Sequence, residues 1–137
     1  MIEFAQVRDV PGAVNPPNAG HEYRVVVAVG EGGDPPRGFL KAGRLYNLLE
    51  THGALGGHHI VAVVYGSAVP SVIADNSACA RAAIDQLNAA GITVAVCSQA
   101  VVDQGFRPKD IVAGVRLDVS AVTTLATLQV EGYALIV

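Results

Sequence analysis

The sequence is poor in charge. Asp, Glu, Lys and Arg make up 15% of its 137 residues, whereas about 25% is typical of a globular domain. Hydrophobic residues make up 51%, which leaves too few charged side chains to cover a monomer, so we expect a homo-oligomer with a buried subunit interface. The net charge is −3 and the basic residues are scattered, which argues against a nucleic-acid partner.

Long apolar runs are also missing. No run approaches the about 20 residues that cross a bilayer, so we expect no membrane span. The first residues, Met1 to Phe4, lack the basic-then-apolar pattern of a signal peptide. We therefore expect a cytoplasmic protein as the sequence stands, or a periplasmic one if a signal peptide has been removed.

Cysteine is scarce as well. Cys79 and Cys97 are the only two, and they form neither a disulfide framework nor a metal-spaced set. His58 and His59 are neighbours in a predicted strand, so their side chains point to opposite faces and cannot share a metal unless the backbone bends. We expect neither a metal site nor another cofactor.

The N-terminal residues 1–22 are dense in proline, glycine and asparagine, which predicts an extended arm. The apolar residues Ile2, Phe4, Val7 and Val10 indicate that part of the arm packs on the body or on a neighbouring subunit. The remaining residues, 23–137, are enough for a single domain with a sizeable core.

Short apolar runs alternate with amphipathic stretches after the arm. The runs predict strands at residues 23–29, 58–65, 92–96, 114–119 and 133–137. The longer stretches between them predict helices at residues 37–52, 77–90 and 121–131, the last with Ser120 as its N-cap. This alternation is typical of an α/β domain with a parallel sheet and helices on both faces. Because apolar residues surround most of the third helix, we expect the sheet to bury one side and a partner subunit the other.

A glycine-rich loop, residues 30–36, follows the first strand. Its place after a strand is that of a phosphate-binding loop. It lacks both the G-x-G-x-x-G spacing and the Lys-Ser/Thr pair of a P-loop. A plain turn is the favoured interpretation, and an anion-binding loop is the alternative.

Cys97 is the strongest candidate for chemistry. It follows the buried strand, and Ser98 and Gln99 open the next turn. The carboxyl ends of parallel strands form the edge where open α/β sheets hold ligands, and helix N-terminal amides there favour a thiolate over a thiol. In the alternative interpretation Cys97 is a buried strand-end residue and Gln99 is a polar group at a helix start.

Three segments together resemble the DsrE/DsrF-like (YchN-like) family of small sulfur-metabolism proteins: residues 96–100 (VCSQA), 120–123 (SAVT) and 128–134 (LQVEGYA). The resemblance covers residues 23–137 and is closest to a branch with a Cys-Gly-Gln motif. It implies a three-layer α/β/α sandwich with a mainly parallel five-stranded sheet in the order 4-3-2-1-5, and assembly into trimers or hexamers. It also implies a persulfide on Cys97, by similarity to sulfur-relay relatives.

Two positions depart from the family pattern. Residues 65–68 read Tyr-Gly-Ser-Ala where the family has a His-Gly-Pro-Ala-like turn, and Ser98 replaces the glycine after the cysteine. The missing histidine removes a possible base near the thiol.

The implied strand order brings several strand ends to one edge. We expect Cys97 to be the catalytic residue there, supported by Tyr65, Gly66, Ser67, Ser98, Gln99 and Ser120. Tyr65 and Ser67 would lie one strand spacing, about 5 Å, from the Cys97 strand, within reach of a persulfide or a bound anion.

Two functions remain open. In the first, the protein is a persulfide carrier, or sulfurtransferase-like protein, that passes sulfur between donor and acceptor partners through Cys97. In the second, it is a non-catalytic oligomeric module whose carboxyl-edge cleft binds a small anion or a protein. The first requires a reactive Cys97, whereas the second tolerates Cys97→Ala.

Overall fold

The computed structural model describes all residues, 1–137, and contains one five-stranded sheet. The strands run in the order β4-β3-β2-β1-β5, and every pair is parallel. This is the order that the family resemblance implied. The bounds are Arg24–Val29 for β1, His59–Val64 for β2, Thr93–Cys97 for β3, Val115–Asp118 for β4 and Ala134–Ile136 for β5.

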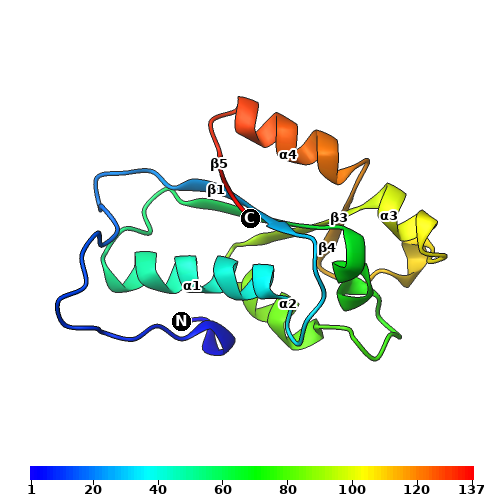
Figure 1. Cartoon of the computed structure of the whole chain (residues 1–137), viewed down its shortest axis with the longest axis horizontal. Helices are drawn as coiled ribbons and strands as arrows, with labels where there is room; N and C mark the ends of the chain where they lie inside the picture. The colour runs from blue at the N-terminus through cyan, green and yellow to red at the C-terminus, as the bar shows by residue number, and fades with distance from the viewer.

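One face of the sheet carries the main core. Helices α1 (Arg37–Thr51) and α2 (Arg81–Ala89) lie against it, below the strands in Figure 1. Alternate residues of each strand point into this core, because successive side chains of a strand face opposite sides. The core joins residues of β1, β2 and β3 to apolar residues of α1 and α2, such as Phe39, Leu49, Ile84 and Leu87, all fully buried.

The N-terminal segment packs under α1. A short 3₁₀ helix, η1 (Glu3–Ala5), places Ile2 and Ala5 in the main core. The fully buried Asn47 side chain donates to the carbonyl oxygens of Ile2 (2.8 Å) and Ala5 (2.9 Å), and accepts from the Ile2 N–H (2.7 Å). The packing that the apolar residues near Met1 indicated is therefore present at these residues.

The opposite face of the sheet is covered by α4 (Ala121–Val130), above the strands in Figure 1. Its core is small and consists of Val26, Val61, Val63, Cys97 and Ala121. The outer side of α4 is open: Val122 is 75% exposed and Val130 is 88% exposed. Within one chain α4 is thus buried on one side only.

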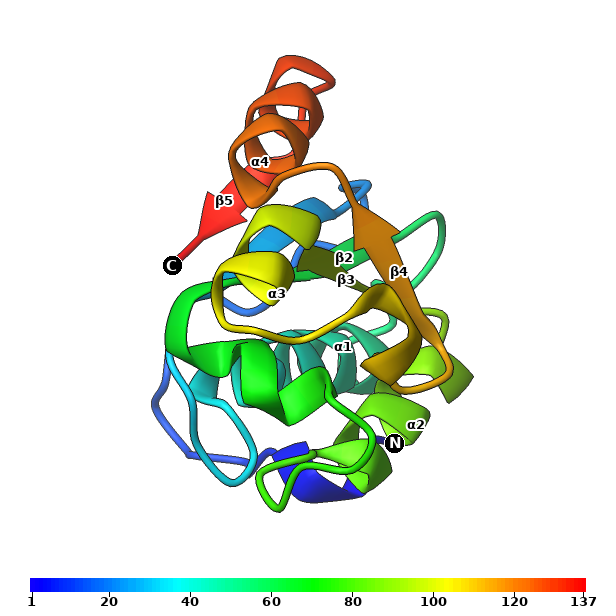
Figure 2. The ribbon, with the colours of Figure 1, turned by 90° about the vertical axis from the view of Figure 1, so that its right-hand side faces the viewer.

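Three short helices complete the fold. A 3₁₀ helix, η2 (Gly66–Val72), follows β2 where only a turn was predicted. The helix α3 (Ser98–Asp103) follows β3 directly, and η3 (Pro108–Asp110) precedes β4. Figure 2 looks at the molecule from the side on which α3 lies.

The predicted start of the second helix at Ser77 is wrong. The helix begins at Arg81, so Cys79 lies in the preceding loop and not in the first helical turn. The Asn76 side chain accepts from the Ala78 N–H at 2.9 Å, which forms a local turn in place of a helix cap. No helix of the structure has the length and apolar character needed to cross a membrane.

Candidate functional site

Cys97 lies where β3 ends and α3 begins. It is the last residue of β3 and also the N-cap of α3, because Ser98 is the first helical residue. Alternation along β3 turns Val96 toward the main core and Cys97 toward the face covered by α4. The residue is 6% exposed, so the thiol lies just below the surface at the carboxyl edge.

The surroundings of Cys97 favour its thiolate. Burial raises the pKa of the thiol, but the backbone N–H groups of Ala121, Ala100 and Gln99 and the side chain of Ser120 form hydrogen bonds that lower it. The hydrogen bonds outweigh burial, and the pKa of Cys97 lies below its ordinary value. The donors come from the starts of two helices, α3 and α4, so amides from both converge on one sulfur atom.

The side chains of Ser98 and Gln99 bind a carbonyl oxygen and not the sulfur. The Ser98 hydroxyl donates to the carbonyl oxygen of Val119 at 2.7 Å, and the Gln99 amide donates to the same oxygen at 3.3 Å. These bonds tie the start of α3 to the connection between β4 and α4. Ser120 is the N-cap of α4, as the sequence predicts, and its hydroxyl accepts from the Val122 N–H at 3.2 Å.

An ion pair on β4 is the part of the site that sequence reasoning missed. Asp118 is the register partner of Cys97 on the neighbouring strand. Arg116 donates to its two carboxylate oxygens at 2.7 and 3.0 Å, and the Thr124 hydroxyl of α4 donates to it at 2.7 Å. Burial raises the pKa of Asp118, but the bonds from Arg116 and Thr124 outweigh it and hold that pKa below its ordinary value. The apolar alternation of β4 was visible in the sequence, but the register that places Asp118 beside Cys97 was not.

The turn after β2 points its polar groups toward the β1 loop. The Ser67 hydroxyl donates to the Gly30 carbonyl oxygen (3.4 Å) and accepts from the Gly32 N–H (3.2 Å). The Gly66 carbonyl oxygen accepts from the side chain of Gln104 at 2.7 Å. The turn therefore ties neighbouring loops together, and none of these bonds reaches the sulfur.

Tyr65 lies between two environments. Its ring packs against the small core that contains Cys97. The same ring covers Gly30 so closely that a Cβ there would lie 2.8 Å from it. A side chain at position 30 would force the tyrosine ring to move, so Tyr65 links the thiol side of the edge to the β1 loop.

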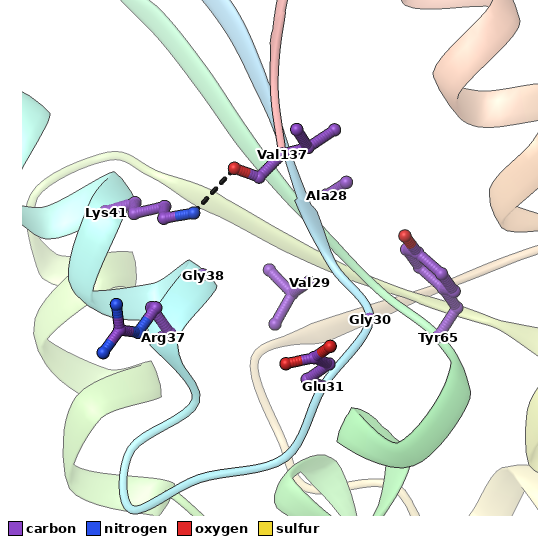
Figure 3. A pocket seen from close by; sticks show the side chains of 9 residues that line it. All are labelled: Ala28, Val29, Gly30, Glu31, Arg37, Gly38, Lys41, Tyr65 and Val137. Atoms are coloured by element: carbon purple, nitrogen blue, oxygen red, sulfur yellow. Dashed lines mark hydrogen bonds between the residues drawn. The ribbon is translucent and has the colours of Figure 1, made fainter.

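A cavity of about 270 Å³ opens at the ends of β1 and β5 (Figure 3). Lys41 and Arg37 of α1, Glu31 and Tyr65 line it with the ends of the strands. Lys41 donates to the Val137 main-chain oxygen at 2.6 Å, and the Arg37 guanidinium is turned away from Glu31. Cys97 does not line this cavity, so the cavity is separate from the surroundings of the thiol.

The sequence and the fold are similar to those of known proteins. A sequence model of the DsrE/DsrF-like family matches residues 24–137. The structure of MTH1491, a protein of unknown function from Methanobacterium thermoautotrophicum, superimposes with a TM-score of 0.71 at 26% identity, over 84% of this chain and 98% of that one. The crystal structure of the ychN protein from E. coli superimposes with a TM-score of 0.62 at 15% identity, over 84% of this chain and 97% of that one. A search of curated proteins gave no match.

Proposed function

The chain belongs to the DsrE/DsrF-like family, and from this membership and the surroundings of Cys97 we propose that it relays sulfur through a persulfide on Cys97. The observation that carries the proposal is the place of Cys97 beside the starts of α3 and α4, where three backbone N–H groups and the Ser120 side chain lower the pKa of its thiol. A thiolate, not a thiol, is the nucleophile in sulfur chemistry. Donors held in place by two helix starts stabilise a negative sulfur without any histidine nearby.

The transfer balances without an oxidant. The Cys97 thiolate attacks the outer sulfur of a protonated donor persulfide, R–S–SH, and forms the new S–S bond. The bond between the two donor sulfurs breaks, and the donor leaves as a thiolate, R–S⁻. An acceptor thiolate then attacks the outer sulfur on Cys97 in the same way and regenerates the Cys97 thiolate. Donor and acceptor are each a thiol-bearing molecule or protein.

Intact-mass measurement tests the proposal directly. After treatment with polysulfide, we expect the Cys79→Ser variant to gain the mass of sulfur on Cys97, and a second thiol protein to remove it. The Cys97→Ser variant is the matched control, because its remaining thiol, Cys79, lies in the loop before α2 and at neither of these helix starts. Equal loading of both variants, or none on Cys97, would overturn the relay.

A second candidate function is a non-catalytic module that binds a small anion at the carboxyl edge. The observation in its favour is the cavity of about 270 Å³ that Lys41 and Arg37 line and Cys97 does not. Titration of inorganic phosphate, followed by NMR shifts of the residues that line the cavity, tests it. Shifts that Lys41→Met abolishes and Cys97→Ser leaves unchanged support it, and an absence of shifts in the unmodified protein contradicts it.

Assembly through α4 belongs to the same proposal. This helix contains no charged residue, yet most of its outer side is exposed. A helix that is apolar all round is normally buried, so we propose that a second copy covers α4 in a trimer or a trimer-based hexamer. Light scattering at micromolar concentration that detects only a species of 14.1 kDa would exclude this assembly.

A further inference from the structure

We propose that Thr124 and Asp118 are positioning residues for the Cys97 thiolate: their hydrogen bond fastens the start of α4 to β4 and so keeps the donors of α4 on the sulfur. This inference rests on the proposed sulfur relay and deepens it. Neither residue touches the sulfur in any hydrogen bond of the structure. Both act through the first turn of the helix.

The fastening is short and mostly shielded from solvent. The Thr124 hydroxyl donates to a carboxylate oxygen of Asp118 at 2.7 Å, and the side chain of Asp118 is only 11% exposed. Arg116 holds both oxygens of the same carboxylate from two residues away on β4. The carboxylate is thus fixed on the strand and offers a rigid acceptor to the helix.

The start of α4 supplies two of the four donors that lower the pKa of Cys97. The Ala121 N–H and the Ser120 side chain both approach Cys97, and they lie within four residues of Thr124. The other donors, Gln99 and Ala100, belong to α3. Because α4 makes few buried contacts of its own, with Ala121 its only buried residue, hydrogen bonds at its start have a large share in fixing its position.

Asp118 also has a direct electrostatic effect, which opposes the positioning effect. Its register pairing with Cys97 places the two residues on the same face of adjacent strands, and a negative carboxylate raises the pKa of a neighbouring thiol. Arg116 offsets that charge. The other titratable groups packed against the small core are Tyr65 and Tyr133, and α4 carries none. Loss of the positioning bond therefore predicts slower alkylation of Cys97, whereas loss of the negative charge predicts faster alkylation.

The test is the pH profile of iodoacetamide alkylation in the full chain with Cys79→Ser, which leaves Cys97 as the one thiol. Thr124→Val removes the donor and keeps the shape, and we expect about fivefold slower alkylation near neutral pH, because the donors of α4 are loosened on the sulfur and not removed from it. Thr124→Ser keeps the hydroxyl and restores the rate. Thr127→Val is the matched control, because Thr127 lies one turn later on α4 and its side chain makes no hydrogen bond, so its rate stays at the parent value.

A further variant separates positioning from charge. Asp118→Asn keeps an oxygen that accepts from Thr124 and removes the negative charge, so we expect a rate at or above that of the parent. A profile unchanged by Thr124→Val in a chain that folds like its parent overturns the positioning role and leaves the relay standing. If Thr124→Val does not fold, Thr124→Ala takes its place in the same comparison. If the chain that carries only Cys79→Ser alkylates with the pH profile of an unperturbed thiol, both the relay and this proposal are overturned.

Discussion

Asn47 fastens the N-terminal segment to the body, and its replacement by leucine tests that role. The change removes the acceptor for the Ile2 N–H and the donor for the carbonyl oxygens of Ile2 and Ala5, at distances of 2.7, 2.8 and 2.9 Å. Leucine is close to asparagine in size but offers no hydrogen bond. The Ile2 N–H and the Ala5 carbonyl oxygen would then lie unpaired in a buried place, whereas the Ile2 carbonyl oxygen keeps its bond from the Ala5 N–H at 3.3 Å.

The magnitude follows from comparing two outcomes. Leaving a buried group unpaired costs about 1–3 kcal/mol, so two such groups cost about 2–6 kcal/mol. Releasing the segment forfeits the burial of Ile2, about 1.5–3 kcal/mol, and a smaller amount for Ala5. Release is the cheaper outcome, so we expect Asn47→Leu to free the segment and to lower the free energy of unfolding by about 2–4 kcal/mol.

Urea denaturation and limited trypsin digestion measure the two parts of this prediction. We expect a lower unfolding midpoint and much faster cleavage after Arg8. Asn88→Leu is the matched control, because Asn88 makes one hydrogen bond, to the Gly114 carbonyl oxygen at 2.9 Å, and its loss costs about 1 kcal/mol. Cys97 lies on the other face of the sheet, so its alkylation rate stays unchanged. An Asn47→Leu protein as stable and as protected at Arg8 as the parent would refute the reasoning.

Three further predictions concern other parts of the molecule. Because hydrogen bonds to Cys97 outweigh its burial and lower its pKa, the folded state holds the thiolate more strongly than the unfolded chain does. The free energy of unfolding therefore rises with pH from below the folded pKa to about 8.5, the unfolded value, and pH-dependent denaturation of Cys97→Ser shows a flatter curve. A Cβ on Gly38 would lie 2.5 Å from Val29, so Gly38→Ala lowers the thermal midpoint with a loss of about 1–3 kcal/mol, whereas Gly56→Ala, with open space around it, does not. Val130→Glu places a charge on the open side of α4 and shifts sedimentation toward a single chain, and an unchanged sedimentation coefficient would exclude this residue from a subunit contact.

Much of the fold could be predicted from the sequence, because helices and strands follow from local patterns. The β-branched runs became β1, β2 and β3 to within about two residues, the usual uncertainty of such boundaries. Ser120 was identified as a helix cap because the preference of serine for that position is itself local. The start of α2 was wrong, because the turn that Asn76 forms competes with a helix cap and the same residue types favour both.

The candidate site, like the fold, could be predicted from the sequence only in part. The sequence by itself placed Cys97 at the end of a buried strand with Gln99 and Ala100 next in the chain, so it determined which amides follow the sulfur. Ser98 and Gln99 were correctly placed at the helix start, but nothing in the sequence indicated that their side chains bind the carbonyl oxygen of Val119. A side chain's partner depends on which loop lies beside it.

Only the tertiary structure decided the rest. The Ala121 amide meets a sulfur that lies 24 positions earlier in the sequence, and Asp118 stands in register with Cys97 because β4 pairs with β3 at that one alignment. Tyr65 covers Gly30 and lines the cavity at the end of β1, a place fixed by the order of the strands. The physical reason is that backbone propensity acts over a few neighbouring residues, whereas register and helix position are set by the packing of the whole sheet.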